Sequence, residues 1–344
     1  MVGGDGQPPT RDDAHAAAGR PPPAVDADGG SRPPLPWRRA VAAPAARMTG
    51  LRDAQTVATA QARLAELLPG EPLEPVRPLG AGLDHAAYLL GDVVVRFPAR
   101  DGAEEAPDPR REAAILGATA NVARIPVPQP LHATAAWIAY RRLPGTPLLD
   151  TPRTARAATA REVAATLGDL LGALWAVPRD ALPAAVPDDP APPTDWRAEA
   201  AAAVAEFAPH LSPPTRAALA DFVAQPAPPP PPARVFSHND LGAEHVLVDP
   251  SSGRVAGVID WADAAVTDPA KDLGLILRDL GEEALAVAHA RCVAALPAAD
   301  PGLLARAVFY ARCLALEDLA HGLAGGDERY SRNASAALDD LLGT

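Results

Sequence analysis

Residues 237–261, with the sequence SHNDLGAEHVLVDPSSGRVAGVIDW, constrain the fold of this chain more than any other segment. Apolar runs at 245–248 and 255–259 predict two short strands, and the DPSSG sequence at 249–253 predicts a hairpin turn between them. Such a hairpin folds back on itself, so its loops meet at one end of a small sheet on a rigid scaffold. We expect four side chains to meet there: His238, Asp240, His245 and Asp260.

This grouping of two carboxylates and an imidazole suits phosphoryl transfer. One carboxylate can orient and deprotonate a hydroxyl group, while the other holds a metal ion on a phosphate chain. Aspartates are also common in turns and at strand ends, which is a sufficient account of Asp249 and Asp263. For Asp240 and Asp260 taken together, the spacing favours the chemical interpretation.

The segment resembles the catalytic core of the aminoglycoside/macrolide phosphotransferase family, whose members are relatives of protein kinases. The family pattern is His-x-Asp, four residues, then Asn or His, and a hydrophobic-Ile-Asp motif further on. His238-Asn239-Asp240, His245 and Val258-Ile259-Asp260 match this pattern, and the DPAKDL sequence at 268–273 also resembles the family. A weaker resemblance extends from about Leu73 to Leu323.

The resemblance implies a role for each matching residue. Asp240 corresponds to the catalytic base, Asp260 to the metal-binding carboxylate, and Asp272 to an aspartate that braces the catalytic loop. His238 is expected to support the loop. His245 stands where most members have Asn as the second metal ligand, although macrolide kinases and their close relatives have His. Because Mg²⁺ prefers oxygen ligands, His245 either binds the metal through one nitrogen or only hydrogen-bonds the base.

Upstream, residues 78–98 predict a hairpin that contains Gly80 and Gly82. A glycine-containing hairpin lets the backbone approach phosphates closely, although ordinary hairpins show the same pattern. Kinase-like folds place a cation on the third strand and pair it with a helix glutamate, so that the cation grips the α- and β-phosphates. Arg96 and Glu112 occupy the corresponding places, with Glu112 in a predicted helix at 111–120.

The expected cation is an arginine because Lys271, the only lysine, lies beyond the catalytic segment. Arginine can grip phosphate through two nitrogens. The alternative is that Arg96 is a solvated charge at a strand end. Further on, residues 136–140 predict a strand and 141–145 resemble the hinge between two lobes, so we expect Tyr140 and Leu143 to contact the nucleotide base.

From Thr151 onward the apolar periodicity is helical, first along one face through Val163, Leu167, Leu170, Leu171 and Leu174. Trp175 follows this face, where the family usually has His. Further helices are predicted at 195–211, 215–224, 273–280, 282–296 and 303–323. The resemblance places the acceptor between the catalytic loop and these helices. The acids that could line that cleft, or be solvated surface residues, are Asp279, Glu282, Glu283, Glu317 and Asp318.

Composition limits the other possibilities. Residues 1–47 contain nine prolines and no sustained apolar period, so they predict a disordered tail, an interaction segment, or an extension before a true start at Met48. The chain has a formal charge of −12, of which the tail carries +1, so the remainder carries −13. This charge disfavours nucleic-acid binding and suits either a cationic small molecule or plain solubility.

The two cysteines, Cys292 and Cys313, lie in apolar helical stretches, which indicates reduced core residues of a cytoplasmic protein. No apolar run is long enough to cross a membrane.

We therefore expect a two-lobed, protein-kinase-like α/β (α+β) fold. A small five-stranded antiparallel lobe with one helix, at 48–140, binds nucleotide, and a larger, mainly helical lobe, at 141–344, carries the catalytic and acceptor sites. The expected reaction moves the γ-phosphoryl group of ATP or GTP, with Mg²⁺, to a hydroxyl of an aminoglycoside- or macrolide-like acceptor. A metabolite kinase acting on amino alcohols or sugars and a regulatory pseudokinase remain alternatives. The acceptor, the nucleotide and the oligomeric state stay open.

Overall fold

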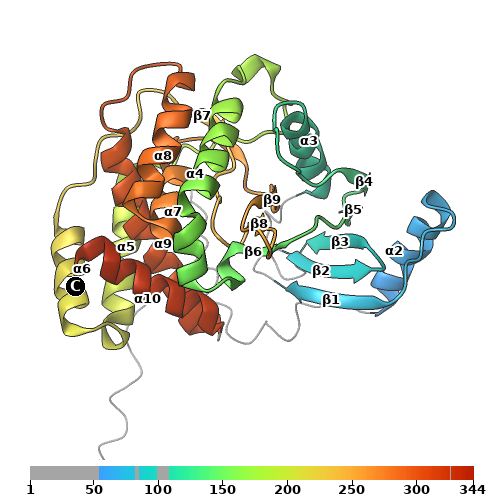
Figure 1. The fold of residues 1–344 in the computed structure, drawn as a ribbon, viewed down its shortest axis with the longest axis horizontal. Coiled ribbons are helices and arrows are strands. Elements are labelled where there is room, and N and C mark those ends of the chain that lie inside the picture. Colours follow the sequence, from blue (N-terminus) through green and yellow to red (C-terminus); the bar gives the residue numbers. More distant parts are fainter. Residues whose placement is uncertain (1–53, 82–84, 99–107, 326) are drawn as a thin grey trace, which may run out of the picture. The chain divides into compact units, whose positions relative to one another are not determined.

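The structure, a computed structural model, describes residues 54–81, 85–98, 108–325 and 327–344. The tail at 1–47 and Gly82 lie outside these described residues. Two regions differ in their secondary structure: a five-stranded sheet with helices comes first, and a mainly helical region with two small sheets follows (Figure 1).

The first region begins with α2 (Ala54–Leu67) and continues through β1 (Val76–Ala81), β2 (His85–Leu90) and β3 (Val93–Pro98). After α3 (Pro109–Ala120) come β4 (Pro130–Ala133) and β5 (Ile138–Arg141). The strands pair antiparallel in the order β1-β2-β3-β5-β4. Helix α2 adds to the single helix that the sequence predicted for this region.

The turn between β2 and β3 depends on Gly91. Its φ is 59°, and a Cβ built on it would come 1.7 Å from the Pro72 carbonyl oxygen, so only glycine fits. This two-residue turn sets the register, in which Ala87 lies opposite Arg96 and Tyr88 lies opposite Val95. Because side chains alternate between the faces of a sheet, Arg96 projects from the face opposite to Tyr88.

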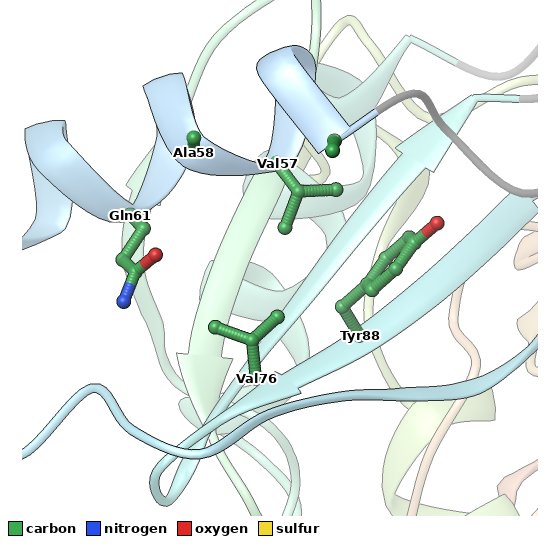
Figure 2. A pocket seen from close by; sticks show the side chains of 6 residues that line it. Val57, Ala58, Gln61, Val76 and Tyr88 are labelled. Carbon is green, nitrogen blue, oxygen red and sulfur yellow. The ribbon is translucent and has the colours of Figure 1, made fainter.

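The Tyr88 face forms the core of this region. Leu64 and Ala60 of α2 are buried against it, together with side chains from β2 and β3 such as Leu90, Val95 and Phe97. A groove of about 350 Å³ lies beside this core. Figure 2 shows Val76 and Tyr88 facing Val57 of α2 across it. The described residues that line the groove are uncharged, and it lies on the face of the sheet away from Arg96.

The second region contains the long helix α4 (Arg153–Trp175), then α5 (Pro193–Phe207), α6 (Pro213–Ala224), α7 (Ala270–Leu280), α8 (Glu282–Cys292), α9 (Leu303–Gly325) and α10 (Glu328–Leu342). Helix α7 packs on α9, and α4 on α8. The helices lie close to their predicted positions, but the sequence did not predict α10. Two predicted helix ends are 3₁₀ turns instead, at Ala208–His210 and Val293–Ala295.

Two small sheets carry the catalytic segment. The first has the order β6-β8-β9, formed by β6 (Thr146–Pro147), β8 (Val246–Val248) and β9 (Val255–Val258). The second pairs β7 (Val235–Ser237) with β10 (Ala265–Thr267). The predicted hairpin is therefore present, with each strand starting or ending one residue inside its predicted limits.

Cys292 and Cys313 are free and buried, which confirms the core positions inferred for them. Within the part of the chain that the structure describes, no helix combines the length and apolar character that a bilayer span requires.

Candidate active site

The catalytic loop connects β7 to β8, and the segment after β9 lies against it. The Ile259 amide donates to the His245 carbonyl oxygen over 2.9 Å, and His238 Nε2 donates to the Ile259 carbonyl oxygen over 3.0 Å. Asn239 and Asp260 have left-handed backbone conformations, with φ of 67° and 61°. Non-glycine residues adopt this conformation at a cost, and such residues concentrate at functional sites.

Asp272, at the start of α7, braces the catalytic loop. Its carboxylate accepts hydrogen bonds from Ser237 Oγ at 2.5 Å, from the Asn239 amide at 3.0 Å and from the Leu241 amide at 3.2 Å. These two amides flank Asp240, so the contacts fix the backbone on both sides of the predicted base. The side chain of His238 is fully buried, with its ring edge-on to Trp261, 4.6 Å between centroids.

Trp175 departs from the family pattern but takes part in this brace. Its indole Nε1 donates to Ser237 Oγ over 3.2 Å, and Ser237 in turn donates to Asp272. The tryptophan at the end of α4 thus supplies a hydrogen-bond donor to the catalytic loop from a buried position.

The structure brings Asp240, His245 and Asp260 together. His245 Nδ1 lies 2.8 Å from the Asp240 carbonyl oxygen and 3.4 Å from Asp240 Oδ2, while Nε2 lies 3.6 Å from Asp260 Oδ2. Because a carbonyl oxygen only accepts, Nδ1 carries a proton and donates to it. Nε2 is then the nitrogen that faces Asp260 and, in the neutral ring, has a free lone pair.

Charges around these groups shift their pKa values in opposite directions. Burial raises the pKa of Asp240 well above the usual carboxyl value, and Glu244, Asp263 and Asp260 add to this against the charge of His245. For His245, burial lowers the pKa, but Asp240 and Asp260 outweigh it and raise the pKa to about 9. Asp260 is also buried, yet Arg96 and His245 hold its pKa below the usual range.

The donor set fits a divalent cation. Asp260 offers a carboxylate oxygen and His245 Nε2 faces it, with the ring held by the Nδ1 hydrogen bond that commonly orients a ligating histidine. Among the described residues, Asp240, Glu244 and His245 also place one donor atom each within 4.8 Å of one another. A bound cation would have to displace the proton from His245, since a ligating imidazole is neutral.

Arg96 is buried between two carboxylates. Its Nη1 lies 2.6 Å from Glu112 Oε1 and its Nη2 lies 2.7 Å from Asp260 Oδ1. Arg96 is 6% exposed and Glu112 1%, which excludes a solvated charge at a strand end. Burial raises the pKa of Glu112 to about 7 despite Arg96, while Asp260 and Glu112 together raise that of Arg96 against its own burial. Arg96 therefore links the sheet, α3 and the segment after β9.

The residues predicted to contact the nucleotide base, Tyr140 and Leu143, lie on β5 and in the segment after it. Tyr140 is buried and pairs in register with Val94 of β3. A Cβ built on Gly257 would come 2.8 Å from Leu143 Cδ1, so Leu143 lies directly over β9. Gly80 lies in β1, beside an irregularity in the pairing with β2.

Of the five acids predicted to line the acceptor cleft, Glu317 is half-buried on α9, and the other four fall into two groups. Glu282 and Glu283, at the start of α8, are exposed, and Glu283 pairs with Arg161. Asp279 and Asp318 instead surround the buried Arg278, at 2.9 Å and 2.8 Å.

Asp279 is engaged within the protein, because its carboxylate also accepts from the Ala243 amide and from Asn333 Nδ2. Asp318 lies nearby on α9 with a neighbour, Glu244, that the sequence analysis had not singled out. Glu244 Oε2 is 3.4 Å from Arg278 Nη2, and its carboxylate also lies beside Asp240 and His245. Burial raises the pKa of Asp318 well above the usual value, and the nearby carboxylates of Glu244 and Asp279 add to this against the charge of Arg278.

The sequence analysis also did not predict a cluster of polar side chains around Lys271 of α7, to which the loop before α5 contributes Asp189. Lys271 is 3% exposed, with its ammonium group paired with Asp189 and 4.9 Å from the centre of the Trp196 ring. Asn239 Nδ2 donates to Asp189 Oδ2 over 3.2 Å and Lys271 Nζ donates to Asn239 Oδ1 over 3.3 Å. This cluster therefore holds the side chain that precedes Asp240. No short-range pattern in the sequence connects Asp189 to Lys271.

A kinase-like phosphotransferase is the class that this fold and site define. A model described as the phosphotransferase enzyme family matches residues 75–308, so the chain belongs to that family. This confirms the resemblance, and with it an enzyme that transfers a phosphoryl group from a nucleotide to a hydroxyl group of a small molecule.

Individual relatives agree with the family. The viomycin phosphotransferase of Streptomyces vinaceus is 29% identical over 279 residues, which cover 77% of this chain and 93% of that protein. Among solved structures, macrolide 2'-phosphotransferase type I is similar with a TM-score of 0.56 and 26% identity, covering 84% of this chain and 98% of that one. The GDP complex of wild-type aminoglycoside 2'-phosphotransferase-IIIa shares the fold, with a TM-score of 0.60, 21% identity, and 85% and 99% coverage.

Proposed function

We propose that this protein moves the γ-phosphoryl group of ATP or GTP to a hydroxyl of a cationic, antibiotic-like small molecule, with Mg²⁺ as cofactor. The observation that carries the proposal is the meeting of Asp240, His245, Asp260 and Arg96 across the two regions of the fold. Aminoglycoside, macrolide and viomycin-like acceptors are the first candidates, and resistance to such an antibiotic is the corresponding biological role.

Asp240 acts as the base in this proposal. Its carboxyl is 35% exposed, so it can reach an incoming hydroxyl, and its raised pKa brings it closer to that of an efficient proton acceptor at neutral pH. The amides on either side of it are fixed by Asp272, which orients the carboxylate. Asp240 accepts the hydroxyl proton as the acceptor oxygen approaches phosphorus.

The phosphate chain would lie between the proposed nucleotide-binding lobe, residues 48–140, and the proposed catalytic lobe, residues 141–344. Arg96 contributes positive charge there, and its guanidinium is kept in place by Glu112. Asp260 and His245 Nε2 would hold Mg²⁺, which neutralises phosphate charge when bound. The Gly80 hairpin, Tyr140 and Leu143 would enclose the rest of the nucleotide.

The cationic acceptor follows from the excess of acid beside the base. Glu244, Asp279 and Asp318 all form ion pairs with Arg278, and Glu244 lies close to Asp240 as well. An amine near Glu244 and Asp318 would balance this charge, with Glu317 close by on α9. Glu244→Gln should therefore raise the acceptor KM with little change in the nucleotide KM, whereas the exposed Glu282→Gln should change neither.

The function is tested by phosphoryl transfer from ATP and from GTP, with Mg²⁺, to viomycin, aminoglycosides, macrolides, amino alcohols and sugars. Wild type is compared with Asp240→Ala and with Asp221→Ala, an exposed aspartate of α6 as control. We expect transfer to at least one cationic acceptor, reduced at least about 100-fold in Asp240→Ala only. Transfer that survives in Asp240→Ala would refute the assigned base. Nucleotide binding without transfer to any acceptor would favour the regulatory alternative.

A further inference from the structure

His85 is the first residue of β2, and Gly80 and Gly82 precede it in the sequence. It lies opposite Pro98, two residues from the pair of Ala87 and Arg96, so its side chain projects from the Arg96 face of the sheet. The other face is the one that α2 covers. His85 is 9% exposed, and no role was predicted for it from the sequence.

Arg96 fixes the proton position on this ring. His85 Nδ1 lies 3.0 Å from Arg96 Nη2, and a guanidinium nitrogen can only donate. Nδ1 must therefore accept, and it carries no proton. Burial lowers the pKa of His85 to about 3, with the charge of Arg96 acting in the same direction, so the ring is neutral at ordinary pH. The remaining proton is on Nε2.

Nε2 is left as a donor without an acceptor. It is buried and has no hydrogen-bond partner among the residues that the structure describes. Buried donors are almost always paired, and an unpaired one in a native protein requires an explanation. Among the described residues, the charges of Arg96 and Arg111 act on this ring, and Asp260 acts against them. A neutral N–H donor on the ring that contacts the Arg96 guanidinium is suited to an anionic oxygen.

We propose that His85 Nε2–H donates a hydrogen bond to a phosphate oxygen of the bound nucleoside triphosphate. Arg96 then has two functions: its Nη2 sets the tautomer of His85, and its charge attracts the same phosphate chain. The inference rests on the proposed function, because it requires that a nucleotide binds on this face of the sheet. It adds a side-chain contact to the backbone contacts expected from the hairpin.

Three substitutions separate this role from structural support. His85→Gln places an amide N–H near the position of Nε2. His85→Asn reproduces only the Nδ1 position, and His85→Phe removes both nitrogens. Binding of Mg·ATP and Mg·GTP is compared by calorimetry with binding of adenosine and guanosine, in the full chain.

We expect His85→Asn and His85→Phe to lose about 10- to 100-fold in affinity for the triphosphate, with unchanged nucleoside affinity, and His85→Gln to retain most of the affinity. Equal losses for triphosphate and nucleoside, or no loss in His85→Asn, would overturn the inference. Wild type that binds no nucleotide would overturn the proposed function itself, and this inference with it.

A second measurement does not depend on the variants folding. In wild type with ¹⁵N-labelled histidine, the His85 ring should show the neutral Nε2–H tautomer, and its Nε2 proton should shift when a non-hydrolysable Mg·triphosphate is added. A proton on Nδ1, or an Nε2 signal unaffected by the triphosphate, would refute the contact.

Discussion

Replacing Asp272 with alanine tests whether the catalytic loop depends on one carboxylate. Asp272 is 1% exposed and accepts from Ser237 Oγ, the Asn239 amide and the Leu241 amide, at 2.5, 3.0 and 3.2 Å. Asp272→Ala removes the acceptor of all three donors while leaving the donors in place. Asp221→Ala, on the exposed surface of α6, is the matched control.

The magnitude follows from the three contacts. A buried donor that loses its partner costs about 1–3 kcal/mol, so three donors set an upper range of about 3–9 kcal/mol. Water entering the space left by the carboxylate would recover part of this, and we expect a loss of about 3–6 kcal/mol in the free energy of unfolding. The loss is large because whole domains are stable by only about 5–15 kcal/mol.

Urea unfolding followed by the fluorescence of the five tryptophans measures this change, and one of them, Trp175, contacts Ser237. Asp272→Asn keeps one acceptor oxygen and should lose less stability than Asp272→Ala. Because the two amides flank Asp240, kcat should fall in Asp272→Asn while the nucleotide KM changes little. An unfolding free energy of Asp272→Ala within about 1 kcal/mol of Asp221→Ala would refute the reasoning.

Two glycine substitutions should change the free energy of unfolding in opposite directions. Gly274→Ala should lower it by about 1–3 kcal/mol, because a Cβ there would come 2.9 Å from the Ala307 carbonyl oxygen. Gly117→Ala meets nothing within 4 Å and should raise it by about 0.5–1 kcal/mol, and thermal melts of the two variants test both. Cys292 and Cys313 should resist DTNB at pH 8 until urea is added, since burial raises both thiol pKa values, that of Cys292 to about 12. His245→Phe should raise the Mg²⁺ concentration needed for transfer about 10- to 100-fold, and His245→Asn should raise it less; equal Mg²⁺ dependence in all three proteins would remove His245 from the metal site.

The features that were predictable from sequence are those encoded locally. The turn at 249–253 and the apolar runs beside it fix the β8–β9 hairpin, and the apolar period of α4 comes from residues within one helix. Helix α10 was not predicted, although its Asp327 N-cap and amphipathic period are local, and it lies beyond the resemblance to the family, which ends near Leu323.

The rest of the site depends on contacts between distant segments, which no local pattern encodes. Asp189 approaches Asn239 because its loop pairs with β10, where the Asp189 amide donates to the Val266 carbonyl oxygen. The tautomer of His85 follows from one guanidinium nitrogen on the neighbouring strand. For Asp279 the sequence indicated a position near the site, but the direction of the side chain, toward Arg278, is set by tertiary packing.

The burial of Lys271 has a practical consequence for chemical labelling. It is the only lysine in the sequence, and its ammonium group is enclosed by Asp189, Asn239 and Trp196. Amine-directed cross-linkers and succinimidyl esters should therefore find no exposed lysine on the folded protein. Labelling of Lys271 by such a reagent would show that the loop carrying Asp189 has separated from α7. Because Asp189 and Lys271 also hold Asn239, the same labelling would show that the catalytic loop has lost these contacts.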